Sequence, residues 1–185
     1  MSEICGTYEF KHFANKAKVE KIKEVFKEYK KTAKNISNFL WKEFFKNGKL
    51  PHKKKISIKH IQSNLSERYK YVCLWQIYGV LESYISNLQN NFAKIIFSSN
   101  ISKEDKLILL ALNYKRAWLK YEKNTIAVYD GEREELIEDF HRHTAKKIFK
   151  HLLKTNKKPS FKNISMHLDG KVVTFLPKQE EKAKS

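Results

Sequence analysis

Apolar residues recur every three or four positions between residues 71 and 97, which is the pattern of one face of an α-helix. The stripe comprises Leu74, Tyr78, Leu81, Ile85, Leu88, Phe92 and Ile95. The opposite side carries Gln76, Ser83, Asn87 and Asn90, and Glu82 is the single charge between residues 71 and 93. A surface helix normally solvates its outer face with charged residues. We therefore predict a central helix buried on both sides, with contact to uncharged polar groups such as base edges as the alternative.

The same spacing predicts a long amphipathic helix over residues 16–46. Asn15 precedes it as an N-cap, and Asn47-Gly48 ends it. Lysines crowd its outer face, and glutamates offset them only in the first half of the helix. A basic loop, HKKK at 52–55, follows, and a short helix is expected around Ile58, Ile61 and Leu65.

Two further helices are predicted in the second half of the chain. Asn100 or Ser102 begins the first, Ser102 forming a capping box with Asp105. Its expected apolar stripe is Leu107, Leu110, Tyr114, Trp118 and Tyr121. After an Asp130-Gly131 turn, the second is expected over residues 132–155, with Leu136, Phe140, Ile148 and Leu152 apolar. Acids in its first turns and lysines in its last complement the helix dipole.

Both ends of the chain indicate β-structure. Residues 7–13 alternate as a strand, and 160–168 and 171–176 flank Asp169-Gly170 as a β-hairpin. Because two strands are marginal alone, we expect the N-terminal strand to join them. The predicted fold is α+β and mostly α. A helical subdomain, 15–156, is inserted into a small antiparallel β-sheet built from 1–14 and 157–185.

Charge narrows the class of partner. The chain of 185 residues has a formal net charge of +18, which points to nucleic acid first and an anionic membrane second. Its 12 Phe, 9 Tyr and 3 Trp interleave with lysines, and aromatic rings stack on bases. Cys5 and Cys73 form no disulfide framework, so a cytoplasmic location is expected. We expect no signal peptide and no membrane span.

The candidate chemistry is sparse. Asp139, His141, His143 and His151 invite comparison with a metal site, but His141 and His143 are two apart and point to different sides of a helix. We expect a solvated basic helix there, with phosphate contact by 141–143 as the alternative. No nucleophile motif, phosphate loop or converging carboxylates indicate a catalytic centre. We assign Trp41 and Trp118 to the core and mark Trp75 and Gln76 as candidate exceptions.

The chain ends resemble a known family. TYEFKHF followed by a long amphipathic helix, and KKPSFKN followed by a hairpin with DG, resemble the N-terminal portion of TnpB/OrfB-family proteins, with PSFK the sharpest local match. These are transposon-encoded RNA-guided nucleases related to type V CRISPR effectors. The resemblance implies a wedge β-barrel with an inserted helical recognition lobe. The family's RuvC nuclease domain and zinc-binding ribbon are missing, so no catalytic residue carries over. Any Mg²⁺ or Zn²⁺ would belong to that part, and none is expected in this chain.

By resemblance, the chain is expected to bind guide RNA and target DNA without cutting, with the RuvC part missing or supplied by another protein chain. The expected DNA-motif residues are Lys70, Tyr71, Gln76, Ser83 and Asn87. The expected nucleic-acid backbone contacts are Lys11, Lys30, Lys31, Lys34, Lys53, Lys54, Lys55, Lys158 and Lys162. The alternative is a helical protein–protein adaptor or regulator with a basic surface. A third hypothesis is a small enzyme without a recognisable motif.

Overall fold

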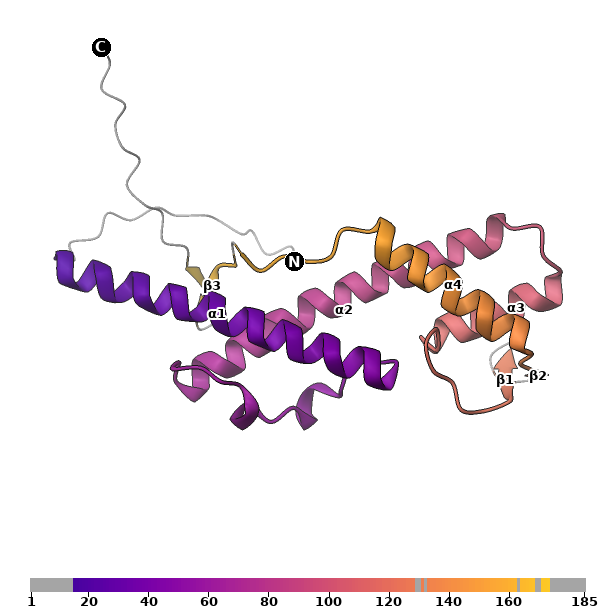
Figure 1. Cartoon of the computed structure of the whole chain (residues 1–185), viewed down its shortest axis with the longest axis horizontal. Helices are drawn as coiled ribbons and strands as arrows, with labels where there is room; N and C mark the ends of the chain where they lie inside the picture. Colours follow the sequence, from indigo (N-terminus) through magenta and orange to yellow (C-terminus); the bar gives the residue numbers. More distant parts are fainter. Residues whose placement is uncertain (1–14, 129–130, 132, 163, 169–170, 174–185) are drawn as a thin grey trace, which may run out of the picture.

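The computed structural model describes residues 15–128, 131, 133–162, 164–168 and 171–173. The described chain is mostly α-helical and contains two small antiparallel sheets, which confirms the predicted α+β, mostly α class. The helices form an elongated molecule, and α2 (Glu67–Ser98) runs through both halves of it (Figure 1). No helix among these residues has the length and apolarity needed to cross a membrane.

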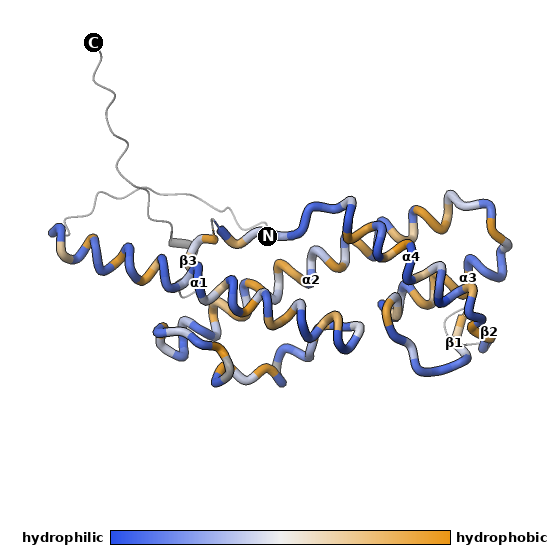
Figure 2. Tube along the Cα trace, in the orientation of Figure 1, coloured by the Kyte–Doolittle hydropathy of each residue, from blue (hydrophilic) through white to orange (hydrophobic). Residues whose placement is uncertain are grey.

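Helix α1 (Lys16–Asn47) matches the prediction at both ends. The Asn15 side chain accepts a hydrogen bond from the Lys18 backbone N–H at 3.0 Å, as an N-cap does. Gly48 ends the helix with φ +75°, and its N–H donates to the Phe44 carbonyl at 2.7 Å. Hydrophilic and hydrophobic positions alternate along the helix (Figure 2). Its apolar face packs on α2.

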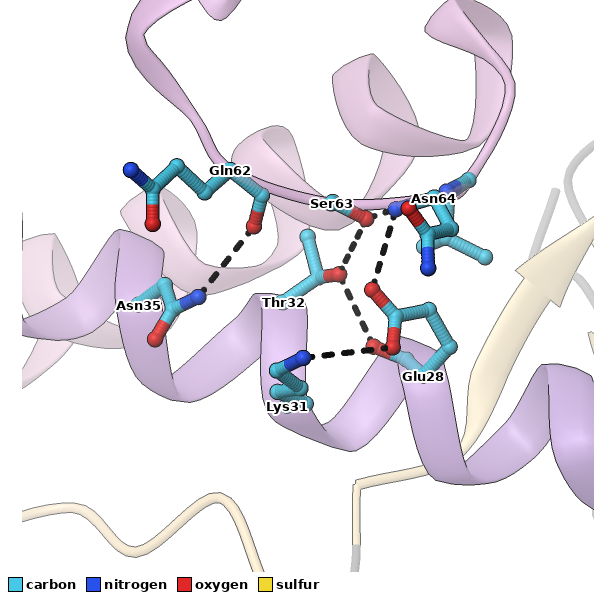
Figure 3. A network of polar contacts seen from close by, with 8 residues as sticks. Glu28, Lys31, Thr32, Asn35, Gln62, Ser63 and Asn64 are labelled. Carbon is cyan, nitrogen blue, oxygen red and sulfur yellow. Dashed lines mark hydrogen bonds and ion pairs between the residues drawn. The ribbon is translucent and has the colours of Figure 1, made fainter.

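The connection from α1 to α2 forms two short 3₁₀ helices, η1 (Lys53–Lys55) and η2 (Ile58–His60). The predicted short helix therefore occurs as η2, but it ends before Ile61 and Leu65. Ile58, Ile61 and Leu65 are nevertheless buried. Polar contacts with α1 hold this connection in place (Figure 3). Thr32 and Ser63 hydroxyls lie 2.6 Å apart, and Asn35 donates to the Gln62 carbonyl at 3.2 Å. A single short turn gains few internal hydrogen bonds, so tertiary contacts decide its form.

Helix α2 divides its apolar stripe between two cores. Its first half packs against α1 and the 56–65 connection, and we call this part the α1 lobe. Its second half packs against α3 (Lys103–Tyr114), α4 (Asp139–Thr155) and β1 (Thr125–Val128), and we call this part the α3–α4 lobe. The α1-lobe core takes Cys73, Leu74, Ile77 and Leu81 from α2, and the α3–α4-lobe core takes Ile85, Leu88, Phe92 and Ile96.

Helix α3 starts as predicted but buries a different face. The Ser102 hydroxyl accepts from the Asp105 backbone N–H at 3.0 Å. The buried residues are Ile108, Leu109, Leu112 and Asn113, whereas Tyr114 is 81% exposed. The predicted stripe is wrong because residues 107–112 are all apolar, so periodicity does not select a face. Trp118 and Tyr121 lie beyond the helix end.

The predicted helix start at residue 132 is also wrong. Strand β2 (Arg133–Leu136) pairs antiparallel with β1, and α4 begins only at Asp139. Of the expected apolar positions, Leu136 and Phe140 are exposed, and α4 buries His141, Ala145, Phe149 and Leu152. Pairing with β1 outweighs the local helical pattern. The helix-dipole explanation therefore applies to Glu138 and Asp139, not to Glu134 or Glu135.

The C-terminal hairpin is confirmed in part, because β3 (Met166–Leu168) pairs antiparallel with β4 (Lys171–Val173). Residues 160–162 and 164–165, predicted as part of the first strand, are not β-structure. Met166 packs into the α1-lobe core. Residues 169–170 and 174–176 of the predicted hairpin lie outside the described residues, as does the predicted strand 7–13. The proposed three-stranded arrangement therefore stays a prediction.

Candidate nucleic-acid interface

The first turns of α2 expose two aromatic side chains. Trp75 is 53% exposed, and Tyr71 lies beside it with ring centres 6.4 Å apart. Lys53, from η1, places its Nζ 5.0 Å from the centre of the Trp75 ring. Burying an indole removes a large apolar area from water, yet this indole stays at the surface. It therefore offers a π-face beside a cation, which is an arrangement suited to stacking on a base.

The neutral residues farther along α2 face solvent. Ser83, Asn87 and Asn90 are exposed, so the prediction of a helix buried on both sides is wrong. Glu82, the one charge in this stretch, forms an ion pair with Arg116. Arg116 has φ 53° and also donates to the Ser86 hydroxyl at 2.9 Å and the Gln89 amide oxygen at 3.1 Å. The outer side of α2 is therefore a solvent-exposed row of hydroxyl and amide groups.

Gln76 belongs to the interior scaffold. Its Oε1 accepts from the Tyr29 hydroxyl at 2.9 Å, and its Nε2 donates to the Ser165 carbonyl at 3.0 Å. One amide thus joins α1, α2 and the segment before β3. These internal partners explain why Gln76 is half-buried while Ser83 and Asn87 are not. We therefore leave Gln76 out of the candidate interface.

A lysine-bearing segment runs alongside α2 from α4 to β3 (Figure 1). At one end Tyr84 donates to the Asn156 carbonyl at 3.1 Å, and Asn91 donates to the Asn156 amide oxygen at 3.2 Å. At the other end the Gln76 contact holds Ser165. On α2, Ser83 lies between Gln76 and Tyr84, and Asn87 lies between Tyr84 and Asn91. Lys158 and Lys162 are exposed on the segment.

The other predicted backbone-contact lysines are scattered. Lys30, Lys31 and Lys34 are exposed on α1, and Lys31 pairs with Glu28 at 3.8 Å, so its charge is partly offset. Lys55 is exposed. Lys70, predicted to contact the DNA motif, is half-buried on α2. Lys11 and the side chain of Lys54 lie outside the described residues. Of the predicted cations, Lys53 contacts Trp75 of α2, and Lys158 and Lys162 lie exposed on the segment between α4 and β3. We call Lys53, Tyr71, Trp75, Ser83, Asn87, Lys158 and Lys162 the Trp75 surface.

His141 has a structural role that its sequence position does not reveal. It is 2% exposed, its Nδ1 accepts from the Glu138 backbone N–H at 3.1 Å, and its Nε2 lies 2.8 Å from Asp105. The prediction of a solvated histidine here is wrong. Hydrogen bonds from Ser102 and His141 lower the pKa of Asp105. Within the described ranges, no three His, Cys, Asp or Glu side chains gather as metal ligands.

Cys73 offers no reactive thiol. It is fully buried between α1 and α2, and its Sγ lies 4.0 Å from the Tyr29 carbonyl. Burial raises its pKa to about 12, which keeps the thiol protonated at neutral pH.

Comparison with protein-family models, curated proteins and solved structures finds no match to this chain.

Proposed function

We propose that this protein binds nucleic acid through the Trp75 surface. The exposed Trp75 ring with Lys53 above it carries the proposal. Stacking of a base on an aromatic ring contributes about 1–3 kcal/mol, and we expect the exposed Lys158 and Lys162 to contact phosphates of the same strand. Ser83 and Asn87 supply neutral donors and acceptors for base edges. Because stacking on Trp75 requires an unpaired base, the proposed ligand is single-stranded, and the resemblance to RNA-guided proteins favours RNA over DNA.

The resemblance to TnpB/OrfB proteins extends this proposal. In that setting the ligands are guide RNA and target DNA with its adjacent motif, and Tyr71, Ser83 and Asn87 contact the motif. Any cutting would come from a RuvC-containing chain, because no catalytic step is assigned to the residues of this one. A cytoplasmic location fits the same proposal. A defined RNA copurifying in stoichiometric amount would support the guide-RNA role specifically.

Tryptophan fluorescence tests the Trp75 contact directly. Trp118 is buried and Trp41 is half-buried, so a stacked base should quench Trp75 selectively. Trp75→Ala should abolish the RNA-induced quenching and weaken binding of a labelled single-stranded RNA about tenfold. Phe97→Ala is the matched control, because it removes an exposed aromatic side chain from the α3–α4 lobe. Equal affinities for both variants would overturn the assignment of the interface.

The adaptor hypothesis rests on a different part of the surface. Phe97, Tyr114 and Leu136 are large exposed side chains of the second half of the chain. An acidic protein partner could cover them and neutralise the net charge. If the purified protein binds neither RNA nor DNA at low salt, while an acidic partner protects these side chains from solvent, the adaptor function replaces the nucleic-acid proposal.

A further inference from the structure

A cleft in the α3–α4 lobe is a second place where cations converge. It has a volume of about 490 Å³ and lies between the first half of α4 and residues 117–121. Lys120, Arg142, His143 and Lys146 line it, with Asp139 as the single carboxylate. The four α4 residues among these are spaced i, i+3, i+4 and i+7, so they share one face of the helix. The cleft therefore presents more positive than negative side chains at neutral pH.

The guanidinium of Arg142 is held in place. It donates to the Tyr121 carbonyl at 2.7 Å, the Lys123 carbonyl at 2.8 Å and the Asn124 amide oxygen at 3.2 Å. These bonds use three of its five N–H groups, which leaves two for a ligand. A cation that is already ordered loses little side-chain entropy when an anion binds.

The wall of the cleft is equally rigid. The Trp118 ring stacks on Phe149 with centres 4.5 Å apart and planes 5° from parallel. Its indole N–H donates to Asn113 at 2.9 Å. On the other side, the Cβ of Lys120 lies within 3.3 Å of the position that a Cβ on Gly48 would occupy. The end of α1 therefore also confines the segment that lines the cleft.

A helix face that is only solvated would carry similar charges. The two cases differ in whether the charged side chains of the cleft are already paired within the protein. Lys120 pairs with Glu122 at 3.3 Å, and both side chains are largely exposed, which makes a weak pair. The side chains of His143 and Lys146 form no hydrogen bond or ion pair with another described residue. The Lys146 ammonium and the His143 ring therefore stand beside an ordered guanidinium as donors without an internal partner, which is a geometry suited to phosphate oxygens.

We propose that this cleft binds a phosphate group of the nucleic acid that occupies the Trp75 surface. The inference rests on the proposed function for the identity of the ligand, and the shared chemistry is a phosphate oxyanion. It has two sources in a single strand: an internal diester, or a terminal 5′-monoester. The cleft lies in the α3–α4 lobe, whereas Trp75 lies in the α1 lobe, so the cleft would be a separate contact with the same nucleic acid.

Neighbouring lysines provide a matched test. Lys146 lines the cleft, whereas Lys147 is equally exposed on α4 but does not line it. Both variants, Lys146→Glu and Lys147→Glu, change the net charge equally. Lys146→Glu should weaken binding of a 12-nucleotide oligouridylate about tenfold and reduce the slope of log K against log salt. Lys147→Glu should weaken it much less. Equal losses would mean general charge attraction and would overturn the proposal.

The ends of the RNA distinguish the two sources of phosphate. If wild type prefers a 5′-phosphorylated oligouridylate over its 5′-hydroxyl form, and Lys146→Glu removes that preference, the cleft takes a terminal monoester. If Lys146→Glu weakens both RNAs equally, the cleft takes an internal diester. Thermal unfolding of both variants should match wild type, because both side chains are exposed.

Titration with inorganic phosphate separates failure of the inference from failure of the proposed function. Amide NMR shifts confined to residues 117–121 and 139–146, and lost in Lys146→Glu, would support the cleft even if no RNA binds. In that case the ligand is a small phosphate compound and the nucleic-acid proposal fails. The opposite result is RNA binding that is weakened by Trp75→Ala but not by Lys146→Glu, together with no NMR shifts on addition of phosphate. That result would support the proposed function and overturn the assignment of the cleft as a phosphate site.

Discussion

The two lobes share α2 but place their polar and aromatic side chains differently. In the α3–α4 lobe, Asn113, Arg116 and His141 hold loops and helix ends through short hydrogen bonds, and Trp118 is 1% exposed. In the α1 lobe, apolar contacts between α1 and α2 form the core and polar contacts such as that between Thr32 and Ser63 hold the connection, while Trp75 stays at the surface. The same residue type thus stabilises one lobe and is available to a ligand in the other.

The difference between the two lobes predicts which substitutions should lower the free energy of unfolding and which should weaken ligand binding. A buried side chain with partners contributes to the free energy of unfolding, and an exposed one with none contributes little. The α3–α4 lobe should therefore be sensitive at its polar residues. The Trp75 surface should tolerate substitution without loss of fold.

The largest expected contrast is between two tryptophans. Trp118→Ala removes a ring stacked on Phe149 and leaves a cavity, so it should cost about 3–5 kcal/mol of unfolding free energy. Trp75→Ala should cost less than about 1 kcal/mol, since its ring is half in water. Urea unfolding followed by circular dichroism measures both. Comparable losses would show that Trp75 is part of the core.

His141 gives the next contrast, within one helix. His141→Ala leaves the Glu138 N–H and Asp105 without their partner and should cost about 2–3 kcal/mol. His143→Ala, two residues away and exposed, should leave stability within about 0.5 kcal/mol of wild type. Denaturant unfolding of the pair checks this. A stable His141→Ala variant would mean that the buried contact is dispensable.

Gln76 and Ser83 sharpen the comparison on α2 itself. Gln76→Ala removes the bridge between Tyr29 and the Ser165 carbonyl and should lower stability by about 1–2 kcal/mol. RNA affinity, measured at a temperature where the variant is folded, should change little. Ser83→Ala should do the reverse, preserving the melting temperature and weakening binding for particular base sequences. If the Gln76→Ala variant loses base discrimination while its stability is unchanged, Gln76 is part of the binding interface.

The smallest expected effect is a pH dependence in the α3–α4 lobe. Hydrogen bonds from Ser102 and then His141 lower the pKa of Asp105 from its ordinary value of 3.8. The folded state therefore binds this proton less readily than the unfolded state does. The resulting stabilisation is complete above the ordinary value and is lost as the pH falls through the lowered one. Asp105→Asn should flatten the dependence of unfolding free energy on pH in this range, while an unchanged profile would assign it to other carboxylates.

The sequence alone determined the elements whose signals are local. Asn15 and Gly48 bound α1 because a capping side chain and a left-handed glycine act on adjacent backbone groups. The apolar stripe of α2 is also a local pattern, and its predicted members Leu74, Leu81, Ile85, Leu88 and Phe92 are buried. The pairing of β3 with β4 follows the predicted hairpin over a shorter range. The net charge of +18 follows from composition and needs no structure at all.

Tertiary structure decided whatever depends on residues far apart in the chain. The apolar run 107–112 fits any helix face, and packing on α2 selected Ile108, Leu109 and Leu112. Strand pairing with β1 outweighed the helical pattern of residues 133–136. Gln76 and Ser83 are alike in sequence terms, yet Tyr29 and Ser165, 47 and 89 residues away from Gln76, made only Gln76 internal. A side chain's availability to a ligand is set by which distant groups satisfy it, and periodicity carries no information about them.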